Sequence, residues 1–97
     1  MRTMIRWSVP AEQGNKSIAS GAMQESIESM LEGLKPEAAY FFASGGKRGG
    51  MMVFDMTDTS QIPQIAEPLF QAFNAEVEFL PVMNPDDLQA AFTKLAS

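Results

Sequence analysis

The chain has 97 residues, 45% of them hydrophobic and 20% charged, with a formal net charge of −5. This composition predicts one folded domain spanning residues 1–97 and is unlike that of a disordered or low-complexity chain. The excess of carboxylates argues against nucleic acid as a partner, because phosphate backbones are held chiefly by Lys and Arg. The chain contains no Cys and no His. Disulfides, thiolate chemistry and histidine-based metal sites are therefore excluded.

Hydrophobic runs predict no membrane partner. Arg6 interrupts the opening segment where a signal peptide needs a continuous apolar stretch, and no run approaches membrane-spanning length. We therefore expect a cytoplasmic protein. The eight methionines fall mostly on helix stripes and strand faces, which is typical of core filler and not of a copper site. We expect no metal and no cofactor.

The first two predicted elements are a strand and a helix. Thr3, Ile5, Trp7 and Val9 alternate with more polar residues, which predicts a strand over about residues 2–9 that ends at Pro10. A polar loop follows. Apolar residues then recur at helical spacing up to Leu34, which predicts a helix that ends near Gly33. Asn15, Ser17 and Ser20 can each cap its start, and Asn15 is favoured.

A hairpin is predicted in the middle of the chain. The apolar segments 37–43 and 51–56 flank the glycine-rich stretch Ser44–Gly50, which suits an antiparallel hairpin with several positive-φ positions. Its spacing matches neither a P-loop nor a dinucleotide fingerprint. We expect Lys47 and Arg48 to lie at an exposed, mobile hairpin tip, where neither is needed for folding.

The second half of the chain predicts a helix, a strand and a terminal helix. The stretch Thr57–Ser60 offers caps for a helix with an apolar side from Ile62 to Phe73, and Pro63 fits its first turn if Ser60 is the cap. Pro68 should kink this helix or make it restart. A strand is expected over about residues 75–82. The sequence Asn84-Pro85-Asp86-Asp87 then combines a capping side chain, a proline suited to the first turn and two carboxylates. Leu88, Ala91, Phe92 and Leu95 form the apolar stripe of the helix that follows.

These elements predict an α+β fold: a ferredoxin-like βαββαβ chain with a four-stranded antiparallel sheet of order 4-1-3-2 and an added C-terminal helix. The strands 38–43 and 51–56 are apolar on both faces, which is typical of a sheet covered on both sides. The two intervening helices can cover only one face. We therefore expect a homodimer, with the terminal helix as the alternative cover.

Three charged residues interrupt otherwise apolar strands and are the candidate site. They are Arg6, Asp55 and Glu78. In a sheet of order 4-1-3-2 they can cluster, and an ion pair of Arg6 with Asp55, Glu78 or both is favoured over a substrate site, because a buried charge needs a partner. Trp7 and Tyr40 are candidate neighbours of this cluster. These five residues form the predicted ligand-binding set, and no catalytic residue can be named.

The chain resembles the dimeric α+β barrel superfamily, in which ferredoxin-like protomers pair their sheets face to face. Residues 1–10 and 77–83 are similar to the first and last strands of its small uncharacterised bacterial members. The superfamily also includes muconolactone isomerases, antibiotic-biosynthesis-type monooxygenases, haem-degrading enzymes and stress-induced domains. The haem enzymes depend on a histidine that this chain lacks, and no catalytic motif of the others matches. The resemblance therefore implies fold and dimerisation more firmly than function.

Two classes of function fit these expectations. The first is a dimeric protein that binds a small organic molecule. Its enzymatic version is a cofactor-free isomerase or monooxygenase in which Arg6 orients an anionic or carbonyl group and Asp55 or Glu78 moves a proton. The second is a non-catalytic ACT-like regulatory module, which shares the βαββαβ order. Convergence of the charged residues on a pocket would favour the enzyme, and a closed ion pair in a filled core would favour the module.

Overall fold

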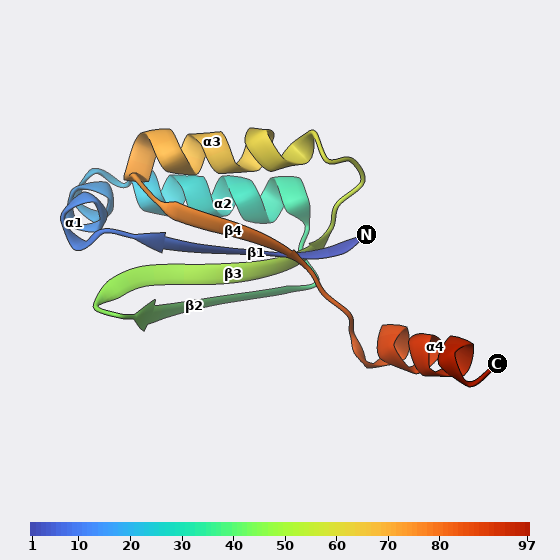
Figure 1. The fold of residues 1–97 in the computed structure, drawn as a ribbon. Helices are drawn as coiled ribbons and strands as arrows, with labels where there is room; N and C mark the ends of the chain where they lie inside the picture. Colours follow the sequence, from blue (N-terminus) through green and yellow to red (C-terminus); the bar gives the residue numbers. More distant parts are fainter.

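The four strands form one antiparallel sheet of order β2-β3-β1-β4 in a computed structural model that describes residues 1–97 (Figure 1). Their bounds are β1 Arg2–Val9, β2 Ala38–Ser44, β3 Lys47–Asp55 and β4 Glu76–Pro81. Strand β1 lies in the centre, where Ile5 is opposite Met52 of β3 and Phe79 of β4. The predicted strand order and the ferredoxin-like α+β class are confirmed.

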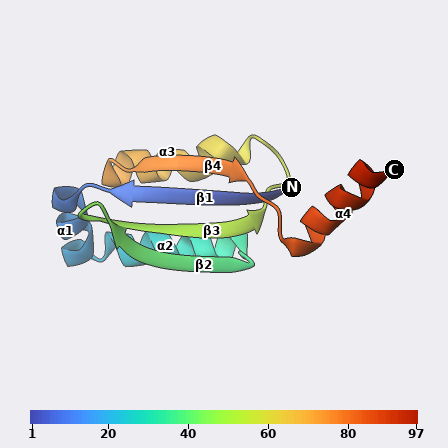
Figure 2. The ribbon, with the colours of Figure 1, turned by 60° about the horizontal axis from the view of Figure 1, so that its bottom comes forward.

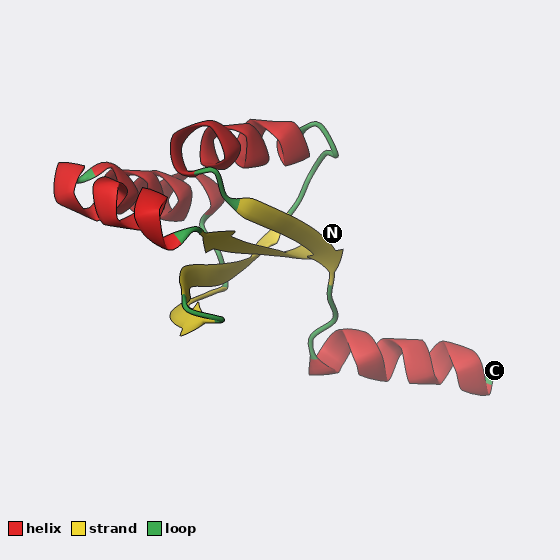
Figure 3. Ribbon diagram, turned by 60° about the vertical axis from the view of Figure 1, so that its left-hand side comes forward, coloured by secondary structure: helices red, strands yellow, loops and turns green.

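Three of the four helices cover the same face of the sheet (Figures 1 and 3). They are α1 Ala11–Ser20, α2 Ala22–Leu34 and α3 Gln61–Phe73. The core lies between them and the sheet, and its fully buried side chains include Ile5, Met52 and Phe54 from the strands. Met23 of α2 and Leu69 and Phe73 of α3 complete it from the helix layer.

The first helical region differs from the prediction of one helix that starts at Asn15. Helix α1 begins at Ala11, directly after Pro10, and α2 follows after a break at Gly21. Gly21 has a φ of 82° and its N–H donates to the carbonyl of Ile18. A left-handed glycine closes a helix in this way at little steric cost. The predicted polar loop is therefore the first turn of α1.

The hairpin is tighter than predicted. Its turn consists of Gly45 and Gly46, whose φ angles are 62° and 75°, and two positive-φ residues form the turn that best matches strand twist. Lys47 and Arg48 belong to β3 and are half-buried, so the prediction of a mobile tip is wrong for both. The Arg48 guanidinium lies over Gly14 of α1 and donates to the side-chain carbonyl of Asn15 at 3.0 Å.

Helix α3 begins after Ser60, one of the four caps that the sequence offers, but the Ser60 side chain makes no capping hydrogen bond. Instead, the Gln61 side chain accepts a hydrogen bond from the backbone N–H of Thr57 at 2.8 Å. The helix runs through Pro68 without restarting. Pro68 lies on the exposed side, and the buried residues Ala66 and Leu69 on either side of it hold the helix against the sheet.

Helix α4 (Pro85–Ala96) starts with the capping box that the sequence predicts. The Asn84 side chain accepts from the Asp87 N–H at 2.8 Å, and the Asp87 carboxylate accepts from the Asn84 N–H at 3.0 Å. The helix has no buried residue and projects beyond the end of the sheet (Figures 1 and 3). The radius of gyration is 15.4 Å, whereas a compact chain of this length has about 12.5 Å. Within one chain, α4 therefore does not cover the sheet.

None of the four helices is long and apolar enough to span a membrane.

Candidate functional site

One face of the sheet carries no helix, and Figure 2 shows it turned toward the viewer. We call it the open face. Because side chains alternate along a strand, the residues paired in register with Met4, Arg6 and Ser8 of β1 share this face. Across the sheet they form three rows: Leu80, Met4, Val53 and Ala38; Glu78, Arg6, Met51 and Tyr40; and Glu76, Ser8, Gly49 and Phe42.

The open face is divided along its strands into two halves of different chemistry. The row from Leu80 to Ala38 is wholly apolar, and we call it the apolar half. It lies near the end of the sheet from which α4 leaves, because Leu80 directly precedes the last residue of β4. The other two rows carry Arg6, Glu76 and Glu78, and together with Lys47 beside them they are called the charged half. The remaining charged residues of this face, Arg2 and Asp55, lie opposite each other beyond the apolar row.

Two ion pairs lie in the charged half. The Arg6 guanidinium Nη2 is 2.9 Å from Glu78 Oε1, with 48% of the Arg6 side chain exposed, and Lys47 Nζ is 3.7 Å from Glu76 Oε1. The Arg6–Glu78 pairing is one of the alternatives that the sequence predicts. The sequence predicts that Arg6 is at least partly buried; it faces the open side of β1 with about half of its side chain exposed, while its neighbours Ile5 and Trp7 face the helices.

A depression of about 290 Å³ lies between these two ion pairs. It is lined by Arg6, Trp7, Ser8, Phe42, Ser44, Lys47, Gly49, Glu76 and Glu78. A Cβ on Gly49 would lie 2.7 Å from the carbonyl oxygen of Trp7, so glycine is needed for the close approach of β3 to β1. The floor of the depression is thus the backbone of β1 and β3, and charged side chains and Phe42 surround this floor.

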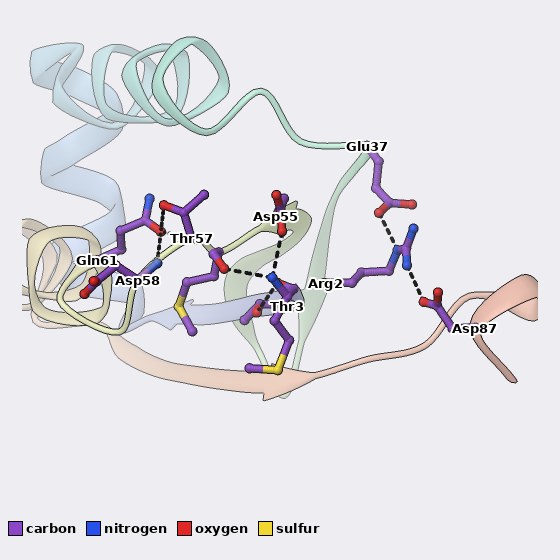
Figure 4. Close-up of polar contacts among 10 residues, drawn as sticks. Arg2, Thr3, Glu37, Asp55, Thr57, Asp58, Gln61 and Asp87 are labelled. Carbon is purple, nitrogen blue, oxygen red and sulfur yellow. Dashed lines mark hydrogen bonds and ion pairs between the residues drawn. The ribbon is translucent and has the colours of Figure 1, made fainter. Parts of the chain in front are cut away.

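The structure brings together only part of the predicted ligand-binding set. Arg6 and Glu78 meet, and Trp7 reaches the edge of the depression although 94% of it is buried on the helix side. Tyr40 lies on the open face in the Arg6 row, 66% exposed, on the outer strand. Asp55 lies at the opposite end of β3, where its carboxylate accepts from the Met1 ammonium at 2.7 Å (Figure 4).

Sequence reasoning missed Lys47 and Glu76. Both had a usable signal. A Gly-Gly turn of two residues predicts that strand pairing resumes at Lys47, and alternation places Glu76 on the same face as Glu78. The missing step was the position of the turn, because the whole stretch Ser44–Gly50 was interpreted as a loop.

A second polar cluster holds the start of α4 to the sheet. Arg2 Nε donates to Glu37 Oε1 at 2.6 Å, and Arg2 Nη1 also donates to the Asp87 carboxylate (Figure 4). The hydrogen bonds that Arg2 donates to Glu37 and Asp87 raise its pKa above the usual value. The Asn84 N–H and the Arg2 guanidinium lower the pKa of Asp87. Each of these groups already has its partners, so the cluster fixes α4 and offers no free ligand-binding group.

Two further carboxylates have lowered pKa values for local reasons. The Met1 ammonium, by hydrogen bond and by charge, lowers the pKa of Asp55. The Ser60 backbone N–H lowers the pKa of Asp58, which accepts from it at 2.8 Å in the turn before α3. The first contact fixes the chain at the start of β1, and the second fixes the turn before α3. No group of three or more acidic side chains is arranged to hold a metal ion.

Two shallower hollows lie away from the open face. One of about 190 Å³ lies between α2 and α3 and includes Met30 and Ile65. The other, of about 370 Å³, is lined by Ile18, Gln24, Ile27, Glu28 and Phe41. Neither contains a cation. The depression on the open face is the one that combines charged groups of both signs with an aromatic side chain, and it is the candidate site.

The fold and the site define a small α+β protein with a helix-covered sheet and a charged depression on its free face. Residues 1–96 match the model of the family described as "Domain of unknown function (DUF3303)". Because this match covers nearly the whole chain, the chain belongs to the DUF3303 family. No curated protein matches the chain.

Proposed function

We propose that the charged half of the open face binds a small organic molecule with a carboxylate or carbonyl group, and that two copies pair their open faces over it as in dimeric α+β barrels. One observation carries this proposal. Two ion pairs, Arg6–Glu78 and Lys47–Glu76, border a single depression beside Phe42. Ligand sites of this kind combine apolar walls with a few convergent polar groups.

The cations give the expected polarity of the ligand. Arg6 presents a planar fork of donors that suits a carboxylate, and Lys47 adds a second positive charge. Glu76 and Glu78 accept hydrogen bonds from hydroxyl or amino groups of the ligand. The apolar part of the molecule packs against Phe42. A depression of about 290 Å³ is at the lower end of ligand sites, which span about 300–1,000 Å³, so a facing copy would complete the enclosure.

The exposure of the Arg6–Glu78 pair favours a role in ligand binding over a purely structural role. An interaction module with a filled core would bury the Arg6–Glu78 pair, whereas both side chains are about half exposed here. In the enzymatic version, a cofactor-free isomerase or monooxygenase, Glu78 would move a proton while Arg6 holds the reacting oxygen. Asp55 does not take part in this version, because it lies at the other end of β3.

Native mass spectrometry of freshly purified protein tests the proposal. We expect a dimer that retains a small molecule, and loss of that molecule in Arg6→Met. Lys16→Met is the matched control, because it removes a cation from the exposed pair with Glu12 on α1, outside the depression. If no molecule is retained, calorimetry with small mono- and dicarboxylates replaces the first measurement. Binding that is equal in Arg6→Met and the unchanged protein, or absent for all of these acids, would refute the proposal.

A further inference from the structure

Helix α4 has an apolar stripe that nothing in the chain covers. Leu88, Phe92 and Leu95 recur at helical spacing and are 40%, 52% and 81% exposed. The helix lies on the open-face side of the sheet, opposite the layer of α1, α2 and α3, and points away from the body (Figures 1 and 3). Its first turn is fixed to β1 by the contact of Arg2 with Asp87. The position of the stripe is thus defined by the fold.

The total exposed surface is too large for a compact monomer. The chain exposes 6391 Å², whereas a compact monomer of 10.6 kDa exposes about 5,500 Å². The excess of about 900 Å² is close to the roughly 800 Å² per partner that a standard stable interface buries. The exposed large apolar side chains include Leu88, Phe92 and Leu95 on α4 and Tyr40, Phe42 and Leu80 on the open face.

Charge indicates what occupies this surface. The open face has three cations, Arg2, Arg6 and Lys47, and three carboxylates, Asp55, Glu76 and Glu78, so its formal charge is zero. The remaining four cations and nine carboxylates carry the whole net charge of −5. A second copy therefore meets no net charge repulsion at the open face, whereas the rest of the surface, taken together, carries five negative charges.

We propose that α4 is a clasp: in the pair of facing sheets, the stripe Leu88, Phe92 and Leu95 of each copy packs against the apolar half of the open face of the other copy. The occupant of both surfaces is thus a second copy of this chain, in a reciprocal two-fold arrangement. The apolar half supplies Met4, Val53 and Leu80 as the receiving surface. This inference rests on the face-to-face pair in the proposed function and adds the element that stabilises it.

Sedimentation equilibrium of full-length variants provides the first test. Phe92→Glu should raise the dimer dissociation constant about thirtyfold or more, since central aromatic residues dominate interface energies. Thr93→Glu is the matched control, because it places the same charge on the next, exposed residue, outside the stripe. It should leave the constant within about threefold, an effect of rim charges only. Equal effects of the two variants would overturn the clasp.

Cross-linking identifies the contact itself. A photoreactive phenylalanine analogue at position 92 is introduced into ¹⁵N-labelled chains, which are mixed with unlabelled chains before illumination. We expect adducts that join labelled α4 to unlabelled peptides containing Met4, Val53 or Leu80. A dimer whose adducts lie only within one chain would refute the clasp and leave the ligand proposal standing. A full-length monomer at all concentrations would refute the clasp and the facing pair, whereas ligand binding is tested separately through Arg6.

Discussion

The two faces of the same sheet differ in almost every respect, although they are made from alternate residues of the same four strands. On β1 the helix side presents Thr3, Ile5, Trp7 and Val9, none more than 6% exposed. The open side presents Met4 and Ser8, which are partly exposed, and Arg6, which is exposed. The first set determines the fold, because it packs against helices in the same chain. The second set is free to have a function that the fold does not require.

The comparison is tested most directly by adjacent residues of β3. Phe54→Ala should cost about 3–5 kcal/mol, because it leaves a cavity in the core where Phe54 is 1% exposed. Val53→Ala, its neighbour on the open face, should cost about 1 kcal/mol or less for a partly exposed side chain. Urea unfolding at concentrations where the protein is monomeric measures both. Similar losses at every concentration would mean that α4 or another segment covers the open face within one chain.

Alanine substitutions at two glycines should change the stability of the protein in opposite directions. A Cβ on Gly50 would lie 2.5 Å from the ring of Trp7 and 3.0 Å from Phe41, which pack edge to face on the helix side. Gly50→Ala should therefore destabilise the protein by about 1–3 kcal/mol through overpacking. Gly33 in α2 has no atom within 4 Å of such a Cβ, and Gly33→Ala should stabilise by about 0.5–1 kcal/mol. Thermal unfolding of both variants checks the difference in sign, and destabilisation by Gly33→Ala would contradict it.

The Arg6–Glu78 pair should contribute little to stability. Because both side chains are about half exposed, Arg6→Met should cost no more than about 1 kcal/mol, and the coupling to Glu78→Gln should be about 0.2–1 kcal/mol. A buried pair would cost about 3–5 kcal/mol on loss of one partner. A double-mutant cycle by urea unfolding, at concentrations where the protein is monomeric, decides between these values. Arg6→Met and Asp55→Asn should be additive, since Asp55 contacts the Met1 ammonium instead.

The smallest expected effect is an acid-induced loosening of α4. The pKa of Asp87 is lowered in the folded state, so its contribution is present above the usual pKa of an aspartate and is lost as the pH falls through the lowered value. Hydrogen exchange of the first turn of α4 should therefore accelerate at acidic pH. Asp87→Asn should give the fast exchange already at neutral pH. Asp86→Asn, at a carboxylate with no hydrogen bond in the structure, should retain the slow exchange, and equal behaviour of the two variants would contradict this role.

Local signals predicted the elements that depend on neighbouring residues. The cap of α4 is encoded within Asn84–Asp87, and the hairpin depends on glycines between two apolar segments. The break at Gly21 was not predicted, because a glycine inside a helical stripe is compatible with either a continuous or an interrupted helix. The packing of α1 beside β3, through Arg48 and Asn15, involves residues that are not neighbours in the sequence.

The candidate site could be predicted only in part, because it depends on register. Alternation indicates that Arg6 and Glu78 each depart from an apolar pattern, but the pairing of Arg6 with Glu78 rather than Asp55 is fixed by hydrogen bonds between strands 72 residues apart. The extent of Arg6 burial, about half of the side chain, could not be predicted from its neighbours. Its apolar neighbours Ile5 and Trp7 describe the environment of the opposite face, not that of Arg6.

The central position of β1 has a consequence for folding during synthesis. This strand is translated first, and its second neighbour, β4, is translated after the rest of the sheet. Until β4 leaves the ribosome, one edge of β1 has unpaired N–H and C=O groups, and such edges promote association with other chains. Arg6 places a charge in the middle of this edge strand, which is a common protection against aggregation. This charge is present on β1 before β4, with Glu78, has been synthesised.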